Sequence, residues 1–248
     1  MRNDADSGDR FAPIYAGRAD AYHELVRRED AQGNLPAALR SIADFEGATV
    51  VELGAGTGRV TGIVAQQAGR VRAFDRSRHM LDQAAVNLSM FRNVSLAEAD
   101  NFSVPLPDGS ADIVIEGWSF GHAVTTAGDG WRKAAEALVA ETARLLAPGG
   151  TAIIIETLGT GFRVPTPPGE VLPAFSSWLE EQQGFQKKWI RTDYLFETVS
   201  KARELVEFFF GEMVDHEVLP TGQVSVPECT GIWWKRKAQQ GAGSPPYW

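Results

Sequence analysis

The chain has 248 residues, of which 44% are hydrophobic, so it is long enough to bury a sizeable core in one or two domains. Its net charge of −8 and its pI of about 5.1 predict that it repels phosphate backbones and anionic lipid, which argues against nucleic acid or a membrane as partner. The single cysteine, Cys229, excludes an internal disulfide and a zinc site built on several cysteines.

The ends of the chain show no targeting signal. Residues 1–10 are polar and acidic, without the apolar stretch of a signal peptide, and no later apolar run approaches the length of a membrane span. We therefore expect a cytoplasmic protein, as a monomer or a homodimer, with flexible tails at residues 1–10 and 238–248.

The first half of the chain changes from a helical to an alternating pattern. Two stretches with helical spacing within residues 11–47 predict an N-terminal helical lead-in that caps the domain. From Thr49 to Thr157, short apolar runs alternate with helical periods, which is the pattern of β-α-β units. The run Ile153-Ile154-Ile155 lacks polar alternation and is typical of a strand of a parallel sheet covered on both faces.

After residue 157 the alternation stops. Residues 158–200 are first rich in Gly and Pro and then in aromatics, and we interpret them as an insertion on the substrate side, after the fifth strand. A helix is expected over residues 200–213, and the strand-like runs 215–220 and 230–237 are expected to pair as a hairpin. We predict one α/β domain over residues 11–237. Its parts are a helical cap (11–47), a cofactor-binding core (48–157), the insertion (158–200), and a final helix with the hairpin (201–237).

A glycine-rich turn follows the first apolar run, in the segment VVELGAGTGRV. Gly54, Gly56 and Gly58 let the chain turn sharply and let its backbone approach a ligand closely. A dinucleotide fingerprint would place its third glycine at the position of Arg59, so the spacing departs from the NAD pattern. Glu52, just before the turn, favours a ligand with positive charge or amino donors over a pyrophosphate. S-adenosylmethionine has both features.

Polar residues follow the next three apolar runs. Asp75 lies about twenty residues beyond the glycines, where a doubly wound fold places an acid that binds ribose hydroxyls. Asp100 and Asn101 follow the third run and are suited to hydrogen-bond an adenine amino group, and Glu116 ends the fourth. Because the carboxyl ends of parallel strands share one edge, we expect these residues to meet at one crevice.

Four segments taken together resemble the successive motifs of a known family. They are ELGAGTGR, FDRSRHML, AEADNFSVPLPDGSADIVIEG and LLAPGGTAIIIE. They resemble class I S-adenosylmethionine-dependent methyltransferases, and are most similar to the ubiquinone/menaquinone-type branch that methylates small molecules. The resemblance covers residues 48–157. It implies S-adenosyl-L-methionine as cofactor and a Rossmann-like, seven-stranded, mostly parallel sheet with an antiparallel C-terminal hairpin, and leaves the acceptor open.

The resemblance also implies roles for single residues. The three glycines would line the methionine part of the cofactor above Glu52, Asp75 would hold the ribose, Arg76 and Met80 would flank the adenine, and Asp100 with Asn101 would reach its amino edge. The candidate cofactor-binding residues are Glu52, Gly54, Ala55, Gly56, Gly58, Asp75, Arg76, Met80, Asp100, Asn101, Phe102, Glu116 and Tyr22.

Two features narrow the acceptor. Glu116-Gly117-Trp118-Ser119 stands where methyltransferases of adenine or glutamine amides carry an Asn/Asp-Pro-Pro-Tyr/Phe motif. The aromatic-rich segment 159–194 is expected to close over a ligand and exclude water, which favours a small aromatic or heteroaromatic metabolite methylated on O, N or C. The alternative is that these aromatics form a small core of their own. The candidate substrate-binding residues are Tyr15, Trp118, Phe120, Phe162, Trp178, Trp189 and Tyr194.

Methyl transfer by direct in-line displacement needs alignment and exclusion of water more than it needs a reactive side chain. His122, at the expected pocket mouth, is the candidate general base, and a histidine that only hydrogen-bonds to structure is the alternative. No metal site is expected. Two other functions stay open: an NAD-dependent oxidoreductase, which the turn spacing and Glu52 disfavour, and a catalytically silent module that binds adenosylmethionine.

Overall fold

The computed structural model describes residues 11–239, so most of the two expected tails lies outside the described residues. The helices are α1 (Ala12–Gly17), α2 (Ala19–Val26), α3 (Asn34–Ile42), α4 (Arg59–Val64), α5 (Arg78–Asn87), α6 (Phe120–Thr126), α7 (Trp131–Leu145), α8 (Val171–Glu181) and α9 (Val199–Phe210). The strands are β1 (Thr49–Leu53), β2 (Arg70–Asp75), β3 (Val94–Glu98), β4 (Ala111–Gly117), β5 (Leu146–Thr160), β6 (Gln186–Arg191), β7 (Tyr194–Phe196), β8 (Glu217–Val218), β9 (Val224–Val226) and β10 (Glu228–Arg236).

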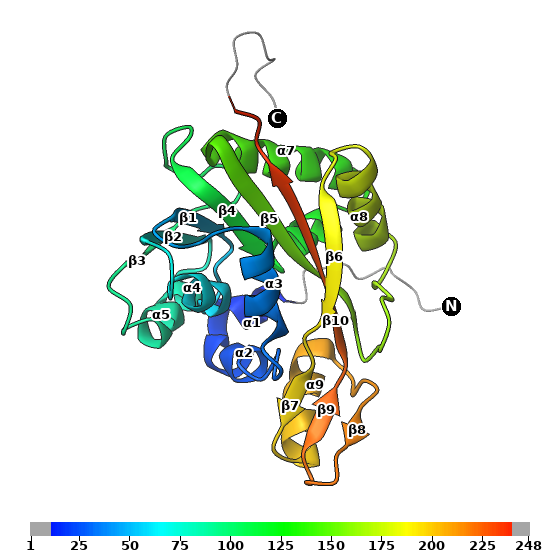
Figure 1. The fold of residues 1–248 in the computed structure, drawn as a ribbon. Helices are drawn as coiled ribbons and strands as arrows, with labels where there is room; N and C mark the ends of the chain where they lie inside the picture. The colour runs from blue at the N-terminus through cyan, green and yellow to red at the C-terminus, as the bar shows by residue number, and fades with distance from the viewer. Residues whose placement is uncertain (1–10, 240–248) are drawn as a thin grey trace.

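A seven-stranded sheet in the order β3-β2-β1-β4-β5-β10-β6 forms the centre of the fold (Figure 1). Strand β10 runs antiparallel to both of its neighbours, while β1 to β5 pair in parallel. The expected Rossmann-like, mostly parallel sheet with a helical lead-in is therefore confirmed. The order of the strands reverses between β1 and β4, which is where open sheets of this kind bind ligands.

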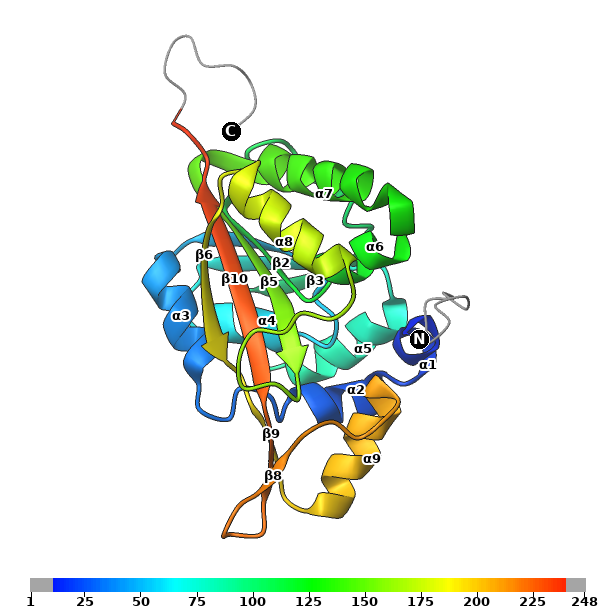
Figure 2. The same ribbon diagram turned by 90° about the vertical axis from the view of Figure 1, so that its right-hand side faces the viewer.

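Helices cover both faces of this sheet (Figure 2). Helices α6, α7 and α8 pack on one face, where Ile154 belongs to an apolar cluster with Phe120 and Trp178. Helices α3 and α4 pack on the other face, where Ile153 and Ile155 join a second cluster. The expectation that the isoleucine run forms a strand covered on both faces is confirmed.

The partner that we expected for the last strand is wrong. Strand β10 pairs with residues 186–191, which form the edge strand β6 rather than part of an insertion. Residues 217–218 pair instead with β9 in a separate three-stranded sheet, β7-β9-β8. The physical reason is burial: Ile232 and Trp233 are at most 1% exposed and need sheet neighbours on both sides, whereas β8 is short and solvent-exposed.

The small sheet β7-β9-β8 and the helices α1, α2 and α9 lie beyond the carboxyl ends of the parallel strands (Figures 1 and 2). Leu25 of α2 packs with Phe196 of β7 and Leu205 of α9 in a third apolar cluster. Helices α1 and α2 also contact α5. The lead-in therefore covers the edge of the sheet where the predicted site lies.

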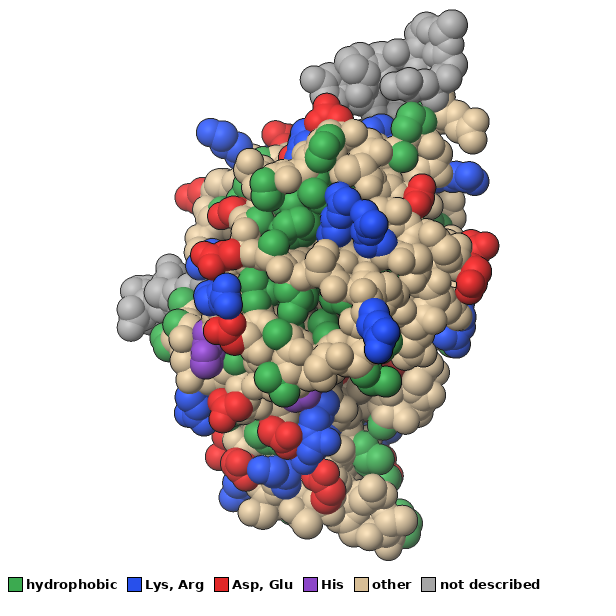
Figure 3. Space-filling model, turned by 90° about the vertical axis from the view of Figure 1, so that its left-hand side faces the viewer, with side chains coloured by type: hydrophobic (Ala, Val, Ile, Leu, Met, Phe, Trp, Pro, Cys, Tyr) green, Lys and Arg blue, Asp and Glu red, His purple; other side chains and the backbone are tan. Residues whose placement is uncertain are grey.

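The charge distribution on the surface and the length of the helices are relevant to two possible partners, nucleic acid and membranes. On the face drawn in Figure 3, acidic and basic side chains lie interspersed over its lower half. Within residues 11–239, no helix combines the length and the apolar character that crossing a bilayer requires.

Candidate active site

The glycine turn between β1 and α4 needs glycine for two reasons. Gly54 and Gly56 have φ angles of 71° and 53°, in the left-handed region that other residues rarely adopt. A Cβ atom on Gly54 would lie 2.3 Å from Cβ of Ser119, so a side chain has no room there. A Cβ on Gly56 would meet only Met80 and Tyr22, at 3.5 and 3.9 Å. Met80 and Tyr22 thus lie over the backbone of the turn.

Asp75 ends β2 beside this turn. Its Oδ2 accepts a 2.8 Å hydrogen bond from the Gly56 amide, and its Oδ1 accepts one of 2.8 Å from the Ser77 amide. Burial raises the pKa of Asp75, and the two amide donors oppose this. Each carboxylate oxygen has a second lone pair, so the side chain is able to accept hydrogen bonds from two ligand hydroxyls as well.

Two buried carboxyl groups lie beneath the turn. Glu52 accepts a 2.5 Å hydrogen bond from the Thr61 hydroxyl, and burial raises its pKa to about 8. Glu116 is 1% exposed; its Oε2 accepts bonds from the Ser119 and Phe120 amides at 3.1 and 3.2 Å. Its Oε1 has no partner among the described residues, and burial raises its pKa to about 7. The proximity of the Glu116 charge also raises the pKa of Glu52.

Of the residues expected around the adenine, Asn101 lies near the glycine turn, whereas Asp100 and Arg76 lie on the surface of the protein. Asn101 donates a 3.3 Å hydrogen bond to the Ser119 hydroxyl and so contacts the turn region. The Asp100 carboxylate accepts a bond of 2.9 Å from the Phe102 amide. Asp100, Phe102 and Arg76 are exposed.

The lead-in contributes an aromatic wall. The Tyr15 hydroxyl lies 2.9 Å from Nε2 of His122, and the two rings meet edge to face. The ring of Phe11 lies 4.7 Å from that of His122 and 4.9 Å from Phe209 of α9, which in turn lies 5.5 Å from Tyr22. We call Phe11, Tyr15, Tyr22, His122 and Phe209 the aromatic cluster. The predicted residues Tyr15, Tyr22 and His122 are thus brought together.

Sequence reasoning missed Phe11 and Phe209. The only signal was the run Phe208-Phe209-Phe210, because three consecutive apolar residues cannot all face one side of a helix. Ser119 was also missed; its hydroxyl lies 3.2 Å from the Leu53 carbonyl oxygen and joins the turn to β4.

The other predicted acceptor residues do not come together. Phe120 and Trp178 are buried in the apolar cluster under α6, α7 and α8, at 0% and 3% exposure. Tyr194 is buried on β7 next to Glu29 and Arg59, while Phe162 and Trp189 are 48% and 45% exposed. The segment 159–194 therefore supplies core and surface side chains rather than one aromatic wall.

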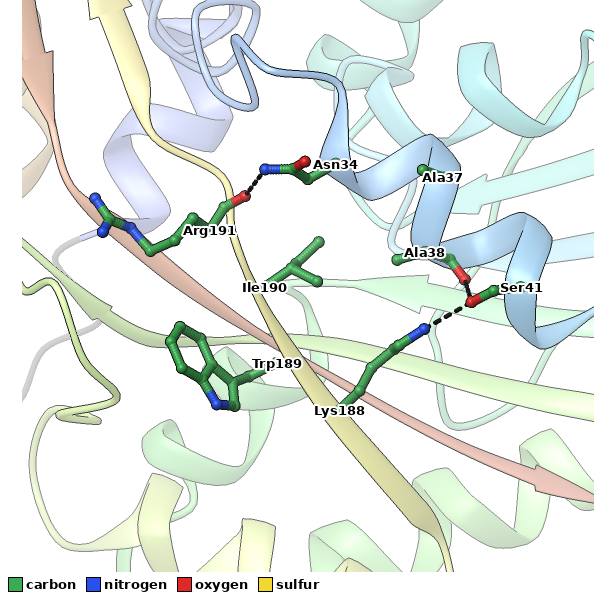
Figure 4. A pocket seen from close by; sticks show the side chains of 8 residues that line it. All are labelled: Asn34, Ala37, Ala38, Ser41, Lys188, Trp189, Ile190 and Arg191. Atoms are coloured by element: carbon green, nitrogen blue, oxygen red, sulfur yellow. Dashed lines mark hydrogen bonds between the residues drawn. The ribbon is translucent and has the colours of Figure 1, made fainter.

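Trp189 borders a separate groove on the outside of the molecule. The groove, of about 540 Å³, lies between α3 and β6 (Figure 4). Its walls are joined by hydrogen bonds from Asn34 to the Arg191 carbonyl and from Lys188 to Ser41. No residue of the glycine turn lines it, so it is distinct from the candidate site.

Within residues 11–239, no group of three His, Cys, Asp or Glu side chains is arranged to hold a metal ion.

Comparison with known proteins agrees with this geometry. A family model described as methyltransferase domain matches residues 51–154, the segment that holds the glycine turn, Asp75 and Glu116. The chain therefore carries a methyltransferase domain over residues 51–154, within a Rossmann-like fold. Two curated relatives are similar. Phosphoethanolamine N-methyltransferase 1 of Triticum aestivum is 31% identical over 125 residues, which cover 49% of this chain and 24% of the relative. An uncharacterized methyltransferase of Geobacillus kaustophilus is 28% identical over 152 residues, covering 61% and 66%.

Solved structures share the fold of this methyltransferase domain. Phosphoethanolamine N-methyltransferase 1 of Haemonchus contortus, in complex with phosphoethanolamine and S-adenosylhomocysteine, superposes with a TM-score of 0.51 at 16% identity, covering 94% of this chain and 48% of that chain. The cyclase SpnF does so with a TM-score of 0.53 at 17% identity, covering 85% and 83%. At such identities the likeness shows the fold alone. The ubiquinone/menaquinone branch stays a prediction.

Proposed function

We propose that this chain transfers the methyl group of S-adenosylmethionine to a small organic acceptor. The observation that carries the proposal is the position of Asp75, whose carboxylate lies 2.8 Å from the Gly56 amide at the point where the strand order reverses. Ligands of open parallel sheets bind at that point, outside the carboxyl ends of the strands. The match of the methyltransferase domain over residues 51–154 supports the same position.

The cofactor would lie across the glycine turn. Asp75 would accept hydrogen bonds from the ribose hydroxyls, and Met80 with Tyr22, which lie over Gly56, would cover the bound nucleoside. Asn101 would face the adenine edge. In this arrangement the helical lead-in excludes water from the reacting atoms, which strengthens every electrostatic interaction in the site.

The reaction would be a single displacement. S-adenosylmethionine supplies an activated methyl group on its sulfonium, and the products are the methylated acceptor and S-adenosylhomocysteine. The chain's contribution is to align the acceptor atom behind the methyl carbon. When the acceptor loses a proton, His122 would take it at Nε2, either directly or through the Tyr15 hydroxyl 2.9 Å away.

The acceptor class follows from the aromatic cluster. Its five rings contact one another and Tyr22 lies over Gly56 of the glycine turn, which favours a flat aromatic or heteroaromatic acceptor by stacking and edge-to-face contacts. The names of the wheat and Haemonchus relatives add phosphoethanolamine as a second candidate. An ammonium group would also suit this cluster, because aromatic faces attract cations.

A screen for S-adenosylhomocysteine release tests the proposal. Purified chain would be incubated with S-adenosylmethionine and a panel of phenols, heteroaromatic amines and phosphoethanolamine, and binding of S-adenosylmethionine and NAD would be measured in parallel. We expect release that depends on one acceptor class. Binding without release across the panel would favour the silent module, and binding of NAD alone would favour the oxidoreductase.

A further inference from the structure

Arg59, the first residue of α4, is a mostly buried cation, with 16% of its side chain exposed. Its Nη1 donates a hydrogen bond to the carboxylate of Glu29, between α2 and α3 of the lead-in. Its guanidinium lies 4.1 Å from the centroid of the Trp118 ring. Its Nη2 is buried and has no hydrogen-bond partner among the described residues. Nη1 of the guanidinium is thus hydrogen-bonded, while Nη2 is buried without a hydrogen-bond partner.

Trp118 holds an unusual backbone conformation beneath this cation. Its φ angle of 56° lies in the left-handed region, which is a genuine outlier for a bulky residue. Its amide donates a 2.7 Å hydrogen bond to the Ile155 carbonyl, so the chain is fixed there as it leaves β4. Such conformations persist only when the surroundings over-determine them, and they cluster at ligand sites.

We call Arg59, Glu29, Thr192, Thr230 and Glu228 the polar cluster. Glu228 is its second member with a buried polar atom that has no partner among the described residues. Glu29 accepts a 3.0 Å bond from the Thr192 hydroxyl, which lies 2.6 Å from that of Thr230 on β10. On the same strand, Glu228 is 2% exposed; its Oε1 accepts a bond from the Thr157 hydroxyl and its Oε2 has no partner among residues 11–239.

The protonation state of Glu228 decides what it offers to a ligand. Burial and the nearby Glu29 charge raise the pKa of Glu228 to about 8, and Arg59 is close enough to lower it in part. At neutral pH its carboxyl is therefore mostly protonated, which makes it a hydrogen-bond donor. Burial raises the pKa of Tyr22, which lies over Gly56, and the nearby Arg59 charge opposes this rise, so the polar cluster adjoins the glycine turn.

Arg59 Nη2 is thus a buried donor without an acceptor, and Oε2 of Glu228 is a second buried polar atom without a partner among residues 11–239. Leaving such groups unpaired is costly, and each one needs an explanation in a native structure. A planar guanidinium with a free N–H edge is suited to the oxygens of a carboxylate or a phosphate. The ring of Trp118 covers one face of the guanidinium, so a ligand oxygen would approach in the plane of the guanidinium.

We infer that Arg59 binds an oxyanion, a carboxylate or a phosphate, carried by the methyl acceptor, with Glu228 as a second donor. The inference rests on the proposed function and names the acceptor's charged group. Because Nη2 is buried, the acceptor would reach it only when the lead-in moves away from the sheet edge. The site therefore selects acceptors by charge as well as by shape.

Matched ligand pairs test this inference. In the presence of saturating S-adenosylhomocysteine, the melting temperature would be measured with a panel of small aromatic acids and their amides, starting with salicylate and salicylamide, and with phosphoethanolamine and ethanolamine. We expect at least one acid or phosphate to raise the melting temperature while its uncharged partner does not. The aromatic pairs and the phosphate pair distinguish the two sources of the oxyanion.

Variants assign the effect to Arg59. The preference should fall by about tenfold or more in affinity in R59M and persist in R78M, which removes an exposed arginine paired with Asp82. Because R59M leaves Glu29 buried without its partner, the double variant E29Q/R59M serves where the single variant unfolds. The variant R59K keeps the charge without the planar fork and should keep only part of the preference.

Two results would overturn the inference. The first is equal stabilisation by every acid and its amide in the wild-type protein. The second is a loss of S-adenosylhomocysteine affinity in R59M with unchanged affinity for methylthioadenosine, which would assign the guanidinium to the cofactor's own carboxylate. Failure of the wild-type protein to bind S-adenosylhomocysteine at all would instead remove the proposed function, and this inference with it.

Discussion

The Tyr15 hydroxyl, in the lead-in, lies 2.9 Å from Nε2 of His122, on α6. The main-chain carbonyl of Tyr15 accepts a 2.7 Å bond from the Ser77 hydroxyl, and the Ser77 amide in turn binds Asp75. One residue of the lead-in therefore contacts both the proposed cofactor side and the proposed acceptor side of the crevice. Closure of the lead-in and assembly of the site are expected to be one event.

Replacing His122 by alanine separates its two candidate roles. As a general base, His122 should be worth about 10²–10⁴ in kcat, and the loss should shrink as pH rises for an acceptor that ionises by itself. Y15F, which keeps the ring and removes the hydroxyl, tests whether the proton passes through Tyr15 on its way to His122. A pH-independent loss below about tenfold in kcat for H122A would leave catalysis to alignment alone.

Two glycines with the same backbone angle separate strain from crowding. Gly54 and Gly33 both have φ of 71°, but a Cβ on Gly54 would lie 2.3 Å from Cβ of Ser119, whereas one on Gly33 meets nothing within 4 Å. G33A should therefore cost about 1–2 kcal/mol of unfolding free energy through the backbone alone. G54A should cost more and should also weaken S-adenosylhomocysteine binding. Equal effects of the two variants in urea titrations would contradict the crowding of the turn.

Two tryptophans of the expected insertion should behave in opposite ways. Trp178 is 3% exposed and packs against Phe175, so W178A should lower the unfolding free energy by about 3–5 kcal/mol. Trp189 is 45% exposed, and W189A should change the unfolding free energy by only about 0.5 kcal/mol. Should W178A keep its stability and raise the acceptor KM instead, the side chain would be part of a lid.

The carboxyl of Glu52 predicts a pH dependence of stability. Its pKa of about 8 in the folded chain exceeds the unfolded value of 4.5, so the folded state binds the proton more tightly between these values. The unfolding free energy should fall as pH rises through this window, by up to about 1.4 kcal/mol per pH unit. E52Q stays neutral and should gain stability relative to wild type as pH approaches 8. E98Q, at an exposed position of β3, is the control, and parallel curves for wild type and E52Q would refute the shift.

The cofactor half of the site was accessible from sequence because it is local. Gly54, Gly56 and Asp75 follow buried strands in a fixed order, and parallel strands bring their carboxyl ends to one edge whatever the details of packing. The hydrophobic periods identified strands β1 to β5 and the helices α4, α5 and α7, but not α6, and they predicted two lead-in helices where the structure has three. Here local pattern and tertiary structure agree.

The acceptor half depends on contacts between distant segments. Phe11 and Phe209 meet only because α9 packs on α2, and Arg59 acquires its partner Glu29 from the lead-in. No periodicity in the sequence reports such pairs. Strand β6 was likewise not predictable from a local pattern. Residues 186–191 carry two lysines, which are typical of a solvent-exposed segment, yet they form the edge strand that β10 requires.

Calorimetric titration of S-adenosylhomocysteine into the wild-type protein and into D75A tests the central claim most directly. D82A, at an exposed carboxylate of α5, is the matched control. We expect binding of S-adenosylhomocysteine and none of NAD, with D75A weaker by about 1–3 kcal/mol because two ribose hydroxyls lose their charged acceptor, and with D82A unchanged. Binding of NAD in place of S-adenosylhomocysteine, or equal affinity of D75A and wild type, would contradict a cofactor site at the glycine turn.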